Sequence, residues 1–158
     1  MPGAIRHQIQ RSLQYNSGTS FWRFYTITSS TITTSAQNLT TAATGRLMIK
    51  NIVVKTDATG LAGGTNFVIA SGNVKGPVNL FVETIANLGA NITKSLSAGH
   101  TTGDLTTGNP NPTVTANATI LEAGKRITYN NTAAVGTGAG TIDIAIQFEV
   151  VDNGATIT

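Results

Sequence analysis

Residues 141–151 read Thr-Ile-Asp-Ile-Ala-Ile-Gln-Phe-Glu-Val-Val, and this stretch decides the fold class. Every second position from Ile142 to Val150 is large and apolar, and Thr, Asp, Ala, Gln and Glu occupy the alternate positions. Successive side chains of a β-strand point to opposite faces, so an apolar period of two predicts a strand with one face on a core. Because the alternate positions are polar, we expect an antiparallel sheet whose second face is exposed to solvent.

Working outward from this strand, other segments have the composition of strands, and the chain as a whole contains 27 threonines. Threonine is β-branched and favours strands, and glycine and asparagine supply the turns between them. The Glu-Ala-Gly-Lys sequence at 122–125 predicts a tight hairpin turn, and residues 31–44 fit either an edge strand or a loop. Seven or eight short strands without a long helix predict an all-β fold, an antiparallel two-sheet sandwich of jelly-roll type. The other predicted strands are 21–28, 46–56, 65–70, 77–85, 113–121 and 126–130.

The length of 158 residues suits one domain, and we place a single β-sandwich domain at 21–158 after an N-terminal arm at 1–20. In the arm, Ile5, Ile9 and Leu13 recur every four positions, which predicts a short amphipathic helix. Because so short a helix is marginal alone in water, the arm is either a disordered terminus or orders against a neighbouring subunit.

The N-terminal sequence lacks the apolar region of a signal peptide, and no apolar run is long enough to span a membrane. We therefore expect the protein to be made and folded in a host cytoplasm, with no membrane partner.

Charge is unevenly distributed along the chain. Residues 1–56 hold six basic and no acidic residues, whereas residues 57–158 hold four basic and seven acidic ones. This asymmetry predicts an anionic partner, either an acidic protein face or nucleic acid. Because the basic residues are spread out rather than clustered, nucleic acid is the less favoured of the two.

No residue pattern in the sequence points to catalysis. The chain has no cysteine, and its two histidines are His7, in the N-terminal arm, and His100, in the predicted loop at 100–112. Asp143 and Glu149 would lie roughly 20 Å apart on one strand face, too far for a glycosidase pair. The glycines at 136–140 precede a strand rather than a helix, so they form a connecting loop and not a phosphate site. The sequence predicts no enzyme, no metal and no cofactor.

Aromatic residues concentrate at 21–25, in the sequence Phe-Trp-Arg-Phe-Tyr. Such a cluster favours core packing or a subunit interface. The alternative is that Trp22 and Tyr25, together with an exposed loop at 100–112, stack on a sugar ring as in a lectin-like module.

The stretch 47–70 (LMIKNIVVKTDATGLAGGTNFVIA) and the segment 120–151, with its ILEAGKRITYN turn and GTGAGTIDIAIQFEV strand, resemble virion structural proteins of tailed bacteriophages. The resemblance covers about half of the chain and includes no catalytic motif. It implies a homotrimeric jelly roll on a capsid lattice, with the basic N-terminal part as the anchor.

Our leading hypothesis is therefore a non-catalytic capsid decoration (cement) protein located in the virion, with a capsid or other virion protein as its partner. A fibre or collar component and a carbohydrate-binding module are the alternatives. The predicted docking residues are Ile5, Arg6, Ile9, Arg11, Leu13, Phe21, Trp22, Arg23 and Tyr25.

Overall fold

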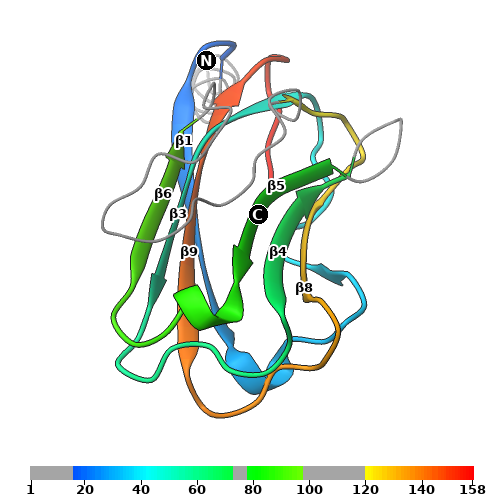
Figure 1. Cartoon of the computed structure of the whole chain (residues 1–158). Coiled ribbons are helices and arrows are strands. Elements are labelled where there is room, and N and C mark those ends of the chain that lie inside the picture. The colour runs from blue at the N-terminus through cyan, green and yellow to red at the C-terminus, as the bar shows by residue number, and fades with distance from the viewer. Residues whose placement is uncertain (1–15, 73–77, 98–119) are drawn as a thin grey trace, which may run out of the picture.

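The computed structural model describes residues 16–72, 78–97 and 120–158 (Figure 1). The helix predicted in the arm, the loop predicted at 100–112, the first part of the strand predicted at 113–121 and both histidines lie outside these ranges. Within them the regular secondary structure is almost entirely β. The strands are β1 (Ser20–Thr28), β2 (Gln37–Asn38), β3 (Leu47–Thr56), β4 (Asn66–Ser71), β5 (Val78–Thr84), β6 (Thr93–Ser97), β7 (Ile120–Leu121), β8 (Ile127–Asn131) and β9 (Thr141–Val150). Two short 3-10 turns, η1 (Ser29–Thr31) and η2 (Ile85–Asn87), complete the secondary structure.

Two antiparallel sheets form the sandwich. Sheet A has the strand order β1-β9-β3-β6, with β7 paired to β3, and sheet B has the order β2-β8-β4-β5. If the two-residue β7 is set aside, the first strand pairs with the last, the second with the last but one, and so on inward to β4 and β5. This nested pairing is the jelly roll, in which two Greek keys wrap around one core. The predicted fold class is confirmed.

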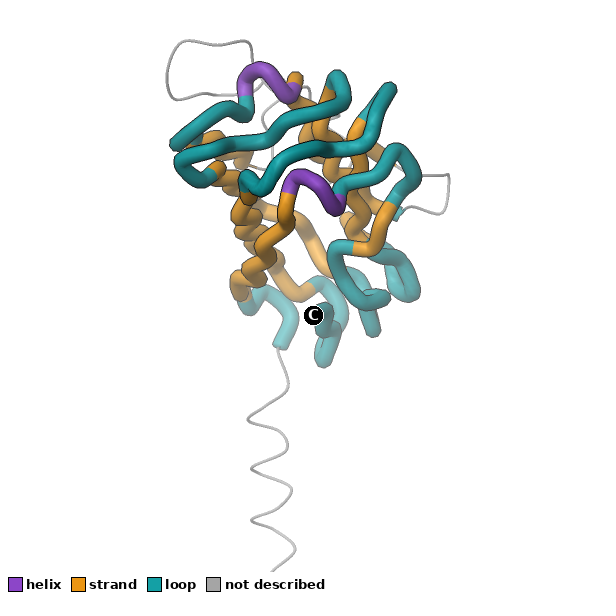
Figure 2. Tube along the Cα trace, turned by 90° about the horizontal axis from the view of Figure 1, so that it is seen from below, coloured by secondary structure: helices purple, strands orange, loops and turns teal. Residues whose placement is uncertain are grey.

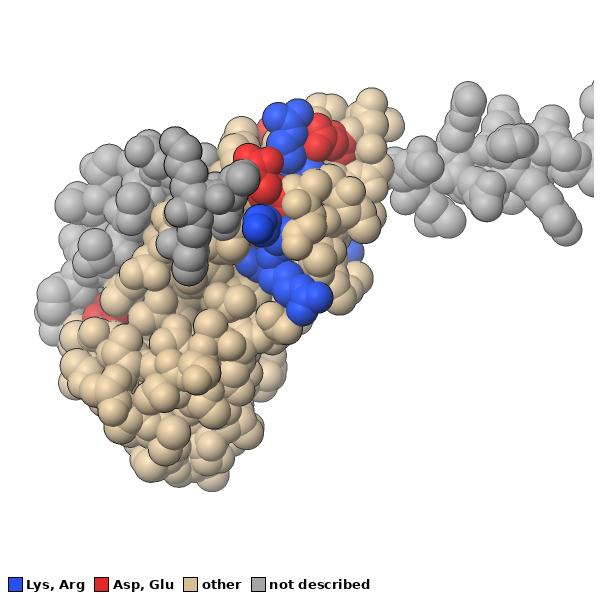
Figure 3. Space-filling model, turned by 90° about the vertical axis from the view of Figure 1, so that its right-hand side faces the viewer, with Lys and Arg blue, Asp and Glu red and all other residues tan. Residues whose placement is uncertain are grey.

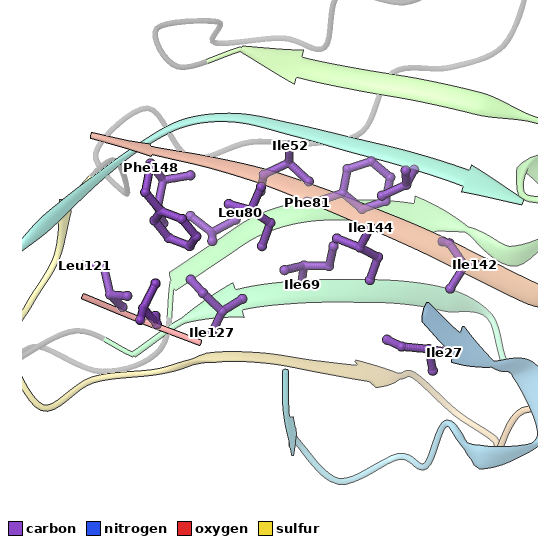
Figure 4. Close-up of a cluster of buried hydrophobic side chains, with 14 of the residues drawn as sticks. Ile27, Ile52, Ile69, Leu80, Phe81, Leu121, Ile127, Ile142, Ile144 and Phe148 are labelled. Carbon is purple, nitrogen blue, oxygen red and sulfur yellow. The ribbon is translucent and has the colours of Figure 1, made fainter. Parts of the chain in front are cut away.

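The core lies between the sheets and is filled mainly from alternate positions of the longer strands (Figure 4). In β9 the predicted alternation holds throughout, because Ile142, Ile144, Ile146, Phe148 and Val150 are all at most 1% exposed. Phe67 and Phe81 of sheet B are completely buried opposite them. Burial of each such side chain is worth about 1.5–3 kcal/mol, so β9 is a major source of stability.

The predicted hairpin at 122–125 is wrong in its connectivity. The turn itself is present, with the Lys125 N–H donating to the Glu122 carbonyl at 3.1 Å. However, β7 before it pairs with β3 in sheet A, and β8 after it pairs with β2 and β4 in sheet B. The turn therefore carries the chain from one sheet to the other, since local turn geometry does not determine which strand each arm pairs with.

Residues 31–44, whose sequence fits either an edge strand or a loop, are mostly loop. This segment contains the end of η1 and the two-residue β2. At the N-terminal side, Ser20 is already the first residue of β1, and the Gly18 N–H donates to the Val150 carbonyl at 2.8 Å. Residues 18–20 thus contact the sandwich directly.

One end of the sandwich is built from four loops that lie side by side, as Figure 2 shows from below. We call the segments 29–33, 57–65, 85–91 and 132–140 the loop end. Backbone hydrogen bonds cross between these loops, including Ser29 N–H to Gly140 O at 2.7 Å and Thr137 N–H to Ala62 O at 2.8 Å. The carboxylate of Asp57 accepts the N–H groups of Thr59, Gly60 and Thr141. These bonds hold the Asp57 pKa below its usual value and join the loop at 57–65 to the first residue of β9. The Asn91 N–H donates to the Asp57 carbonyl at 2.7 Å and joins the loop at 85–91 to the same residue.

Glycine is required in the loop end because backbones approach one another closely. A Cβ atom at Gly136 would lie 1.8 Å from the Ser29 carbonyl oxygen, and one at Gly140 would lie 1.7 Å from the Gly60 carbonyl oxygen. No side chain fits in such gaps, so the four loops pack through bare backbone.

Replacing Gly136 by alanine is expected to lower the free energy of unfolding by about 2 kcal/mol, because the new methyl group forces the loop at 132–140 away from Ser29. Gly89→Ala is the matched control, since a Cβ there meets nothing within 4 Å and should change stability by about 0.5 kcal/mol or less. Urea unfolding followed by circular dichroism measures both. Equal midpoints for the two variants would contradict the close packing.

Candidate docking surface

Strand β1 divides the predicted aromatic cluster between its two faces. Phe21 and Ile27 are buried on the core side, whereas Trp22 is 37% and Phe24 75% exposed on the other side. The outward positions of β1 lie on the outer face of sheet A, away from the core. Only part of the cluster is therefore available to a partner.

The inward residues of the cluster are engaged within the domain. The Phe21 ring packs on Phe148 with centroids 5.6 Å apart, and the Arg23 guanidinium lies 4.9 Å from the Phe21 ring. The Arg23 Nε donates to the Ile157 carbonyl at 2.7 Å, which attaches the C-terminal segment to β1. Tyr25 is half-buried, and burial raises the pKa of its hydroxyl. These contacts give Phe21, Arg23 and Tyr25 structural roles in the domain.

The structure does not bring the predicted glycan pair together. Trp22 and Tyr25 are three positions apart on a regular strand, and an odd spacing places two side chains on opposite faces. Trp22 instead neighbours Phe24, with ring centroids 6.4 Å apart and an interplanar angle of 19°. The five predicted docking residues of the arm, from Ile5 to Leu13, lie outside the described residues.

An apolar patch crosses sheet A at the level of Phe24. Phe24 is opposite Ala145 of β9, and Ala145 is in turn opposite Val53 of β3. Because alanine and valine are short, nothing on these strands covers the Phe24 ring. We call Trp22, Phe24, Val53 and Ala145 the aromatic patch.

A shallow groove of about 270 Å³ lies beside Phe24, between Val53, Lys55 and Asp143. The Thr26 hydroxyl donates to the Asp143 carboxylate at 2.6 Å, which fixes one wall of the groove. Toward the other end of the same face, Lys50 and Glu149 form a partly exposed ion pair at 3.3 Å. The rim around the patch therefore carries two positive and two negative side chains. An apolar centre with a mixed polar rim is the composition of a protein–protein contact surface.

Phe24, Val53 and Ala145 were not among the predicted docking residues. The alternation within β1 was the available signal, since Ser20, Trp22, Phe24 and Thr26 share one face of any strand drawn through this segment. Val53 and Ala145 follow only from the strand pairing.

The described residues contain no group of three or more His, Asp or Glu side chains placed to hold a metal ion. No helix in the part of the chain that the structure describes is long and apolar enough to cross a membrane.

No known protein family matches the sequence, and neither does any curated protein. Among solved structures, the cyanophage Pam1 capsid asymmetric unit is similar at 18% identity and a TM-score of 0.34, covering 85% of this chain and 86% of the other. The infectious bursal disease virus Gx strain structure is similar at 12% identity and a TM-score of 0.21, covering 86% of this chain and 38% of the other. The subviral particle of VP2 from the same virus gives 14% identity and a TM-score of 0.18, with coverages of 86% and 39%.

These likenesses are too distant to assign a function. The strand order of its two sheets therefore defines the class of the protein. The chain is a jelly-roll β-sandwich with an exposed apolar patch on sheet A.

Proposed function

We propose that the chain is a non-catalytic virion structural protein of a tailed bacteriophage, which decorates the capsid and docks on it through the aromatic patch. The observation that carries this proposal is Phe24, which is 75% exposed beside Trp22 although the core of the sandwich is already filled. Neither ring belongs to the buried core cluster. Exposed aromatic residues in an apolar patch are typical of protein contact sites, where tryptophan in particular contributes much of the binding energy.

The rest of the proposal follows from the shape of the surface and from the sequence. A sheet face is broad and stiff, so it can reinforce a capsid by contacting more than one subunit. Residues Ile5 to Leu13 of the basic arm add a second attachment element, and the decorating unit is a homo-oligomer, which we take to be a trimer. The resemblance of residues 47–70 and 120–151 to phage virion proteins supports this assignment.

Removing the aromatic patch is expected to abolish attachment. Phe24→Ala should weaken binding to capsids by about 30-fold or more, and Trp22→Ala by a similar factor, because central aromatic residues of an interface each contribute 2 kcal/mol or more. Co-sedimentation with capsids assembled without the protein measures the affinity. Val82→Ala is the control, because Val82 is a partly exposed apolar residue on β5 of sheet B, away from both the aromatic patch and the loop end. Unchanged binding of Phe24→Ala would refute the docking surface, provided that its melting temperature matches the wild type.

A carbohydrate-binding module is the second candidate, and the groove beside Phe24 is the observation that favours it. Sugars bind to sites in which an aromatic ring lies beside polar groups. The groove provides the Phe24 ring and the polar groups of Lys55, Asp143 and Thr26. Glycan-array binding that is lost in Phe24→Ala, without any binding to capsids, would favour this candidate over decoration, because Phe24 is the aromatic residue exposed at the groove. Binding to purified tails instead of heads would favour the fibre or collar alternative.

A further inference from the structure

The loop end carries almost no charge. Its four segments contain no lysine, arginine or glutamate, and the carboxylate of its single aspartate, Asp57, accepts the N–H groups of Thr59, Gly60 and Thr141. The exposed side chains there are small and neutral, namely alanine, threonine, serine and asparagine, with Val135 as the only large apolar one. A typical protein surface has about a quarter to a third charged residues.

The opposite end of the sandwich is charged. Arg46 precedes β3 and forms a salt bridge with Asp152 at 2.8 Å, while Lys125 and Arg126 precede β8. In Figure 3, acidic and basic side chains gather toward the upper part of the molecule, and the lower part of that view shows none. The charge difference is therefore a property of the two ends and not of the whole surface.

The loop end also has small side chains and fixed loops, which favour close contact with another protein surface. Alanine loses no rotamer freedom when it is buried, and threonine and serine lose little, so covering this surface costs little side-chain entropy. The loops are already fixed by bonds such as Thr137 N–H to Ala62 O and by the contact of Gly136 with Ser29. A rigid surface pays little further ordering cost on association. Small side chains also let a facing backbone approach closely.

We propose that the loop end is the surface through which copies of this chain contact one another, around a symmetry axis that passes near Val135. In a symmetric assembly, residues near the axis face their own copies, so a charge there meets the same charge. A neutral surface avoids that repulsion. At the opposite end of the sandwich, Arg46, Lys125 and Arg126 would face the same charges on the other copies. An acidic or basic partner would instead require complementary charge, which the loop end does not offer. The occupant that fits is a second copy.

This inference rests on the homo-oligomer of the proposed function and assigns it a surface. It leaves the aromatic patch free, because that patch lies on the outer face of sheet A and the loop end lies at the ends of β3, β8 and β9. One unit can therefore self-associate and dock on a capsid at the same time.

The test compares two alanines that are both exposed in loops, Ala134 in the loop end and Ala123 in the turn at the charged end. Light scattering on a size-exclusion column, over a range of protein concentrations, gives the mass of the wild type and of each variant. We expect an oligomeric wild type, an Ala134→Lys variant whose dissociation constant is at least about tenfold higher, and an Ala123→Lys variant that matches the wild type.

Two outcomes would overturn the inference. An oligomeric wild type with an equally oligomeric Ala134→Lys variant would show that copies contact through another surface, while self-association itself would stand. A wild type that is monomeric at every concentration would overturn both the surface and the oligomer. Capsid co-sedimentation of the same samples is read separately, since it reports on the aromatic patch and so distinguishes this failure from failure of the docking proposal.

Discussion

Replacing Ile146 by aspartate is expected to unfold the protein. Ile146 is completely buried in the middle of β9, between Arg23 of β1 and Ile52 of β3 in the strand register. The substitution removes about 1.5–3 kcal/mol of apolar burial and places a carboxylate in the core, at a further cost of several kcal/mol. A total of about 5 kcal/mol or more is comparable with the whole stability of an ordinary domain. The cooperative thermal transition, followed by circular dichroism, should disappear.

The neighbouring position supplies the control. Gln147 lies on the outer face of the same strand, opposite Trp22 and Asn51. Gln147→Asp introduces the same side chain one residue away and should cost about 1 kcal/mol or less, because the carboxylate stays in water. A melting temperature of Ile146→Asp within a few degrees of that of Gln147→Asp would contradict the assignment of the two faces of β9.

The contrast between these two residues also explains which parts of the fold could be predicted. In β9 large aliphatic residues alternate with polar ones, so the sequence alone distinguishes the core face from the outer face. In β1 it does not. Phe21, Arg23 and Tyr25 alternate with Trp22 and Phe24, and each face has aromatic residues. The pairing of Phe21 with Phe148 decides which face is buried, and that contact joins residues far apart in the chain.

Long-range pairing limited the other predictions in the same way. The turn at 122–125 was recognised from its residues, but the sheets to which its arms belong depend on β3 and β4. The loop end combines the glycine-rich segments 57–65 and 132–140, which are each identifiable as loops in the sequence. Their contact at the Ala62–Thr137 bridge is visible only in the structure. Turns and strands are encoded locally, whereas surfaces are assembled from distant segments.

Lys94→Met is expected to destabilise the protein by about 3–5 kcal/mol, which is the cost of leaving one member of a buried ion pair without its partner. Lys94 of β6 and Glu83 of β5 form this pair at 2.6 Å, and their side chains are only 4% and 3% exposed. Since β6 is an edge strand of sheet A and β5 an edge strand of sheet B, the pair joins the two sheets along one side of the sandwich. Urea unfolding measures the loss.

A second substitution separates the charge from the packing. The Glu83 Oε1 atom also accepts the Thr84 N–H at 2.9 Å and the Asn87 amide at 2.8 Å, so an apolar replacement would leave two donors without an acceptor. Glu83→Gln keeps that oxygen and removes the charge. In the Lys94→Met background it should therefore restore about 2 kcal/mol, because the buried carboxylate is no longer unpaired.

The two single variants and the double variant form a thermodynamic cycle, in which a coupling energy of about 2 kcal/mol or more is expected for residues in direct contact. Additive effects, with the double variant as unstable as the sum of the single ones, would show that Lys94 stabilises the edge by packing its aliphatic chain rather than by pairing with Glu83. A strong coupling would instead identify this pair as the link that closes the sandwich between β5 and β6.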